Sequence, residues 1–155
     1  MKRRAYAQSV VEMALLTPLI ILFVLGITDG GYYVYIYSEL ENAARRGSEW
    51  AYKSPPTTTT TADDDTTDQC AILIKDDVLK HTFLSGLKLS DITITYPEEQ
   101  RRDINVPIQV TINYTGQWLT PLGRTLFGPN IKFSFSSRRT IINTSPPATL
   151  NDGCS

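Results

Sequence analysis

The first third of the chain holds a concentrated run of apolar residues. Val10–Ile27 is almost wholly apolar and is interrupted by Glu12, Thr17 and Pro18. At about 1.5 Å per residue, a helix of this length crosses most of a hydrocarbon core about 30 Å thick. Several tyrosines follow, and tyrosine favours the membrane–water interface. The pattern predicts one long helix over residues 8–52, with its first half in a membrane.

Small residues recur every four positions along this predicted helix. Gly26 and Gly30 have the spacing of G-x-x-x-G helix contacts, and Ala43, Gly47 and Ala51 form a second row. Small residues let another backbone approach closely, so all five are candidate helix-packing positions. For the second row, packing on the protein's own sheet is an equally good interpretation.

A loop and a second, shorter helix are expected after the long one. Pro55 cannot continue a helix, and residues 53–68 form a threonine- and aspartate-rich loop. Asp68 is a suitable N-cap for a helix over residues 69–84, which Gly86 would end. The apolar positions of this helix are Ala71, Ile74 and Val78.

The remainder of the chain alternates apolar and polar residues with a period of two. Such alternation predicts strands at 92–96, 104–114 and 131–135, in a sheet with one covered face. The polar turn 97–103 joins the first two strands as a hairpin. Pro107 cannot donate a backbone hydrogen bond, which suggests a sheet edge or a bulge there.

These elements predict an α+β fold, with a long N-terminal transmembrane helix packed against a small antiparallel sheet and a second short helix. The expected organisation is a basic leader at 1–7, the long helix at 8–52, the loop at 53–68 and an extracytoplasmic domain at 69–155. Residues 118–127 are expected to form a loop whose apolar side chains cap the core or face a neighbouring subunit.

Charge supports this topology. Lys2, Arg3 and Arg4 precede the apolar run, so the N-terminus is expected in the cytoplasm and the bulk of the chain outside. The net charge of -1 gives no bias toward nucleic acid. Cys70 and Cys154 both fall in the outer part, where a disulfide is favoured if the compartment is oxidising.

The residues for metal or cofactor chemistry are sparse. The single histidine and two distant cysteines do not supply the usual four zinc ligands. Asp63–Asp65 lacks the spacing of a calcium loop and is expected to be a solvated charge run. We predict no cofactor and no enzymatic activity, although an aspartate pair assembled from distant loops stays open.

Glu12 is the costly residue of the apolar run. A carboxylate in hydrocarbon is unfavourable by a few kcal/mol on insertion scales and tends to mark function. Its position near the cytoplasmic end also allows it to reach the interface. A removable secretory signal is the competing interpretation of the N-terminus. An internal glutamate and a helical pattern that continues past the run argue against it.

Three stretches resemble the TadE-like proteins of tight-adherence (Tad) pilus systems. They are Gln8–Pro18, with its Q-S-x-V-E-x-A-like start, Gly26–Gly31 with its glycines and acid, and Asn42–Gly47, which reads N-A-A-R-R-G. The resemblance covers about residues 3–52, with a weaker likeness over residues 107–142. It implies a pilin-like fold.

The resemblance also implies type IV pilin processing. A prepilin peptidase would cut between Ala7 and Gln8, which makes Glu12 the fifth mature residue. Family members usually have glycine before the cut, where this chain has Ala7. The freed amine of a neighbouring subunit would then pair with Glu12, and such a buried ion pair sets register more than stability.

The resulting hypothesis is a structural or assembly subunit, a minor pilin or pseudopilin, of a Tad-type pilus. Its implied partners are the membrane, other pilin subunits, the pilus assembly machinery and the prepilin peptidase. The alternative is a membrane-anchored adhesion or binding domain that is not built into a filament.

Overall fold

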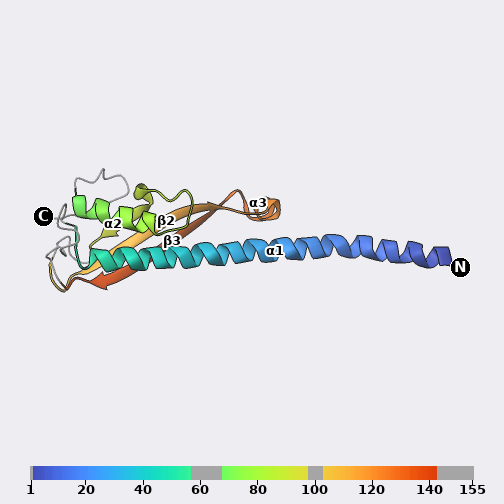
Figure 1. Ribbon diagram of the computed structural model, residues 1–155, viewed down its shortest axis with the longest axis horizontal. Coiled ribbons are helices and arrows are strands. Elements are labelled where there is room, and N and C mark those ends of the chain that lie inside the picture. Colours follow the sequence, from blue (N-terminus) through green and yellow to red (C-terminus); the bar gives the residue numbers. More distant parts are fainter. Residues whose placement is uncertain (1, 57–67, 98–102, 143–155) are drawn as a thin grey trace. The chain divides into compact units, whose positions relative to one another are not determined.

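The computed structural model describes residues 2–56, 68–97 and 103–142, with side chains from Val10 onward (Figure 1). The elements, in order, are α1 (Lys2–Ala51), α2 (Gln69–Lys80), the 3₁₀ turn η1 (Leu89–Asp91), β1 (Ile92–Thr95), β2 (Pro107–Gln117), α3 (Pro121–Phe127) and β3 (Asn130–Thr140). They form two compact units, one of residues 1–35 with 116–131 and the other of residues 36–115 with 132–155. The predicted α+β fold is confirmed.

The second unit contains the antiparallel sheet, in the order β1-β2-β3. Ile92 pairs with Ile112, and Ile94 pairs with Val110, so the predicted pairing of the first two strands is confirmed. Beyond the end of β3, Ile141 donates its N–H to the carbonyl of Val106 over 3.0 Å. Alternate residues of β1 and β2 are buried, as the period-two pattern predicts.

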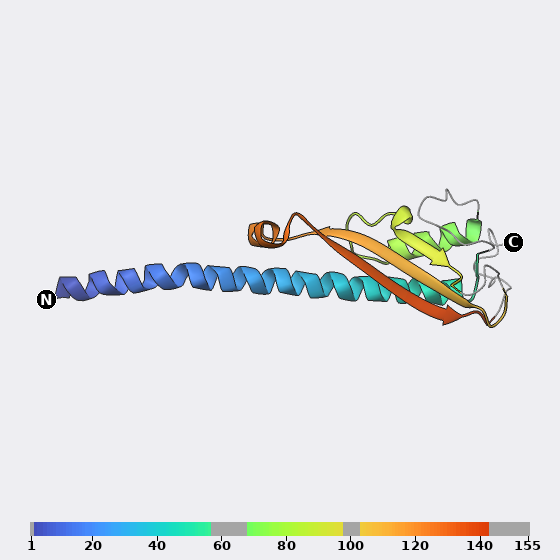
Figure 2. The ribbon, with the colours of Figure 1, turned by 180° about the vertical axis from the view of Figure 1, so that it is seen from behind.

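The C-terminal half of α1 covers the buried face of this sheet (Figure 2). Small residues on its inner face allow a close approach. A Cβ atom added at Gly47 would lie 3.1 Å from both Val110 of β2 and Val78 of α2, so Gly47 is packed against both elements. The fully buried large side chains of this core include Ile36, Leu40, Ile74, Val78, Ile92, Ile94, Ile108, Val110, Ile112 and Ile141.

Helix α2 begins where the sequence predicts. The Asp68 side chain accepts hydrogen bonds from the N–H groups of Cys70, at 2.9 Å, and Ala71, at 3.4 Å. Such a cap satisfies amides that have no partner within the helix. Arg46 of α1 donates from Nε to Asp77 of α2 over 2.8 Å and ties the two helices together.

The predicted end of the second helix is wrong, and the strand bounds also differ: β2 is Pro107–Gln117 and β3 is Asn130–Thr140. Helix α2 ends at Lys80, not near Leu84, and His81 is its C-cap; Gly86 lies beyond it with a φ of 90°. Pro107 is the first residue of β2, the middle strand, and lies two positions before Gln109, where the pairing with β1 ends. A first position needs no donor on the ladder, which explains how proline fits there.

Another error concerns the segment between β2 and β3. It was expected to be a loop, but it contains the short helix α3. Thr120 is the N-cap of α3, and its hydroxyl accepts from the N–H of Gly123 over 3.4 Å. Pro121 occupies the first turn, where proline's missing N–H costs nothing.

Candidate functional site

The first compact unit contains the apolar half of α1. Most of its large side chains are exposed, from 50% at Leu16 to 75% at Leu15, and Leu25 is half-buried. The helix is long and apolar enough to cross a membrane, and none of its most apolar window is buried within the protein. A core helix of a soluble protein would be covered instead, so the exposure favours a lipid-facing role.

Two hydroxyl groups of α1 are bonded to the helix's own carbonyl groups. The Thr17 hydroxyl donates to the carbonyl of Met13 over 2.6 Å, and the Thr28 hydroxyl donates to the carbonyl of Val24 over 2.9 Å. Hydroxyl groups bonded back to their own helix can enter hydrocarbon at low cost. Pro18 lies inside α1, and the helix continues through it.

Asp29 organises a site between α1 and α3. It lies just beyond the apolar run and is 6% exposed. The N–H of Thr120 donates to its Oδ1 atom over 2.9 Å, and the Thr120 hydroxyl donates to its Oδ2 atom over 2.5 Å. The same hydroxyl accepts from Gly123, so one threonine both caps α3 and holds α3 against α1.

Position 123 must be glycine because the backbone there lies very close to the side chains of Asp29 and Trp118. An added Cβ atom would lie 2.6 Å from Oδ2 of Asp29 and 2.8 Å from two ring atoms of Trp118. Any side chain at this position would displace the carboxylate or the indole. Gly123 therefore serves close packing here.

The hydrogen bonds explain the acidity of the site. The hydroxyl of Thr120 is the main cause that holds the pKa of the Asp29 carboxyl below its ordinary value. Burial acts in the opposite direction, whereas the backbone N–H groups of Thr120, Leu119 and Gly123 lower the pKa further. Asp29 is therefore ionised at neutral pH, and its charge is matched by donors from the β2–β3 connection.

A largely apolar cavity of about 340 Å³ opens beside Asp29. It is lined by Leu22, Gly26, Asp29 and Gly30 of α1 and by Trp118, Leu122, Gly123, Leu126 and Phe127 of the β2–β3 connection. The rings of Trp118 and Phe127 have their centroids 5.1 Å apart. Apolar residues of α1 and of the β2–β3 connection thus line one cavity.

The predicted processing site lies inside α1. The Ala7–Gln8 bond is helical, and Glu12 follows on the exposed part of the same helix. Both the cut and the role of Glu12 stay predictions, because they concern events between subunits.

The two rows of small residues have different surroundings. An added Cβ atom at Gly26 or Gly30 would meet nothing within 4 Å, so that face is open apart from the cavity. Ala43 and Ala51 are buried, and Gly47 contacts Val110 and Val78. For the second row, the structure places the protein's own sheet and α2 against the helix.

The structure describes the first of the two cysteines but not the second. Cys70 is buried in the first turn of α2. Cys154 lies outside the described residues, so a Cys70–Cys154 disulfide stays a prediction. Asp63–Asp65 of the threonine-rich loop lies outside them too. Among the described residues, no group of three acidic, histidine or cysteine side chains could hold a metal ion.

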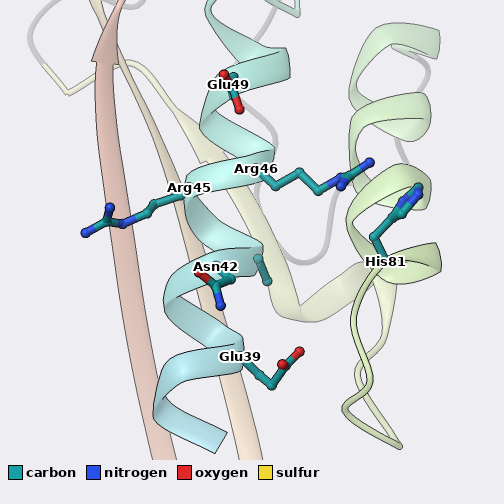
Figure 3. A pocket seen from close by; sticks show the side chains of 7 residues that line it. Glu39, Asn42, Arg45, Arg46, Glu49 and His81 are labelled. Atoms are coloured by element: carbon teal, nitrogen blue, oxygen red, sulfur yellow. The ribbon is translucent and has the colours of Figure 1, made fainter. Parts of the chain in front are cut away.

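A polar groove of about 260 Å³ lies between α1 and α2 in the second unit (Figure 3). Glu39, Asn42, Arg45, Arg46, Glu49 and His81 line it, together with Ala43. In Figure 3, Arg46 extends toward α2, whereas Arg45 points to the other side of α1. The Nδ1 atom of His81 lies 2.9 Å from the backbone oxygen of Asp77. His81 thus has a helix-end role, and this open charged groove has no nucleophile–base pair.

These features define a protein whose long N-terminal helix is apolar enough to cross a membrane in its first half and belongs to a small α+β domain in its second half. Residues 7–49 match the family described as TadE-like protein, which confirms the resemblance carried by the N-terminal motifs. The match extends over 43 of the 155 residues. It covers the apolar run, Asp29 and most of the buried half of α1. Comparisons with curated proteins and with solved structures found no match.

The sequence did not identify Asp29, Thr120 or Gly123 as functional residues. The pattern Thr120-Pro121 is typical of a helix start and was the available local signal. No local signal connects it with Asp29, because the two residues are far apart in the chain and meet only in the folded protein.

Proposed function

We propose that this protein is a structural or assembly subunit, a minor pilin or pseudopilin, of a Tad-type pilus. The observation that carries the proposal is that the TadE-like match falls on a helix whose two halves have different surroundings. Its first half exposes apolar side chains and its second half belongs to the core of a folded domain. The N-terminus is proposed to lie in the cytoplasm, with the domain outside.

The continuity of α1 supports a retained anchor over a removable signal. Leu22 and Gly26 line the same cavity as residues of α3, and Asp29 is bonded to Thr120. Cleavage after the apolar run would remove Leu22 and Gly26 from this site. Cleavage between Ala7 and Gln8 would leave it intact, so we propose that the prepilin peptidase cuts there.

Glu12 is proposed to pair with the freed amine of a neighbouring subunit. A carboxylate on the exposed apolar half of α1 needs a cation once it leaves water, because an unpaired charge in hydrocarbon is costly. In this scheme Glu12 fixes the axial register of adjacent helices, and the exposed apolar side chains of α1 pack between subunits.

The direct test is complementation of a strain that lacks the protein. The wild-type gene should restore pili in the sheared surface fraction, and Glu12→Gln should lower piliation by about tenfold or more, as expected for loss of one buried charge pair. Glu12→Asp keeps the charge and should restore part of it. Unaltered piliation in the deletion strain would overturn the proposal. Normal function of Glu12→Ala in a monomeric inner-membrane protein would favour an anchored adhesion domain.

A further inference from the structure

The β2–β3 connection, which contains α3, carries large apolar side chains that are exposed. Leu119, Leu126 and Phe127 are 59%, 65% and 70% exposed. A short, solvent-exposed connection in an extracytoplasmic domain would ordinarily be polar. Leu126 and Phe127 line the same cavity as Leu22 and Gly26, so the exposed apolar residues of the connection adjoin the exposed apolar part of α1. Figure 1 shows α3 beside this part of the helix.

The position of α3 along α1 sets its depth. Thr120, the N-cap of α3, is bonded to Asp29 just outside the apolar run, and α3 shares a cavity with Leu22 within the run. At about 1.5 Å per residue, Leu22 lies about 8 Å inside the outer end of the run at Ile27. Helices that lie in the membrane interface bury their apolar faces by about 5–10 Å. The two depths agree.

We propose that α3 inserts its exposed apolar face into the outer leaflet of the membrane that α1 crosses. The partner of this exposed face is therefore lipid, at the boundary between the headgroups and the acyl chains. Trp118 suits this level, because its amphipathic ring favours the interface. Asp29 can lie there at acceptable cost because Thr120 donates two hydrogen bonds to its carboxylate.

This insertion rests on the proposed membrane anchoring and adds to it a second contact with the bilayer. One helix alone leaves a domain free to tilt and rotate about the anchor. A side element such as α3, held to α1 through Asp29, would fix how this unit faces the membrane before a subunit leaves for a filament.

Fluorescence quenching by brominated lipid tests the proposal on the full chain. The protein has two tryptophans, Trp50 and Trp118. The Trp50→Phe variant leaves Trp118 as the emitter, and the Trp118→Phe variant leaves Trp50, which follows Ile27 by about 35 Å of helix. Each is reconstituted in phosphatidylethanolamine–phosphatidylglycerol vesicles, with or without phosphatidylcholine brominated near the start of its acyl chains.

Trp118 emission should fall by about half in the brominated vesicles, since the ring lies within reach of the upper acyl chains, whereas Trp50 should change little. A third chain provides the anchoring control. It carries Leu19→Trp and both tryptophan-to-phenylalanine substitutions, so its emitter lies on the exposed apolar half of α1. Circular dichroism verifies that all three chains keep their helix content.

Quenching of Leu19→Trp without quenching of Trp118 overturns the insertion of α3 while the anchor stands. In that case the exposed face of α3 would bind a second copy of the chain instead of lipid. Failure to quench Leu19→Trp overturns the membrane anchoring itself, and the insertion with it. Equal quenching of Trp118 and Trp50 also contradicts the proposal, because it would show contact with lipid along the whole protein.

Discussion

Replacement of Gly47 tests how closely α1 packs on the sheet and α2. A Cβ atom at this position would lie 3.1 Å from the Val110 and Val78 side chains, where ordinary contacts begin at 3.4 Å. Both valines are 0% exposed, so neither can move into solvent. To restore an ordinary contact distance, α1 would therefore have to move away from both valines at once.

Two opposing terms set the size of the effect. Alanine in place of glycine favours a helix by about 1 kcal/mol. Overpacking of a well-packed core costs about 1–3 kcal/mol. We expect Gly47→Ala to lower the free energy of unfolding by about 1 kcal/mol net. Gly47→Val adds further methyl groups and forfeits part of the helix gain, so its loss should exceed about 3 kcal/mol.

The assay is urea unfolding of the full chain in mild detergent, followed by Trp50 fluorescence in the Trp118→Phe background. A loss of 1 kcal/mol should lower the midpoint by about 0.5 M or more. The double variant Gly47→Ala/Val78→Ala is the matched control, because truncation of Val78 opens space for the new methyl group. It should recover about 1 kcal/mol relative to the sum of the single changes.

The reasoning would be refuted if Gly47→Ala raised stability by the full helix-propensity gain and Gly47→Val were tolerated. That result would mean that this part of α1 does not lie against the two valines. Additive effects in the double variant would point the same way, since residues that do not touch show little coupling.

Three further predictions concern the Asp29 site and the sheet. Gly123→Ala should displace the Trp118 ring, and acrylamide quenching of the Trp50→Phe chain should detect its greater exposure. The low pKa of Asp29 means that its contribution to α3 docking is fully present above about pH 3.9, its unfolded value, and is lost as pH falls through the lower folded value. Thr120→Ala should move this acid transition of Trp118 fluorescence to higher pH. Ile112→Ala in the sheet core should lower the free energy of unfolding by about 2–5 kcal/mol, measured by urea unfolding.

The sequence was most informative where one local pattern decides the structure. The apolar run and the row of small residues predict α1, and Asp68 predicts the start of α2, because helix periodicity and capping are local properties. The alternation along β1 and β2 likewise predicts which side chains enter the core. Each of these signals spans no more than a few turns or one strand.

The Asp29 site could not be predicted in this way. Pro121 and Gly123 are typical of a loop, and α3 is too short to be stable by propensity alone. It is held by a threonine that bonds an aspartate on a distant part of the chain. The end of α2 was missed for a related reason, since His81 is a C-cap without the glycine that usually signals one.

The mature N-terminus tests the central claim most directly. Protein recovered from sheared, assembled pili would be digested and its N-terminal peptide identified by mass spectrometry. A pilus subunit processed by a prepilin peptidase should begin at Gln8, which makes Glu12 the fifth residue of the mature chain. An intact Met1 on protein within assembled pili, or absence of the protein from the pilus fraction, would contradict the account.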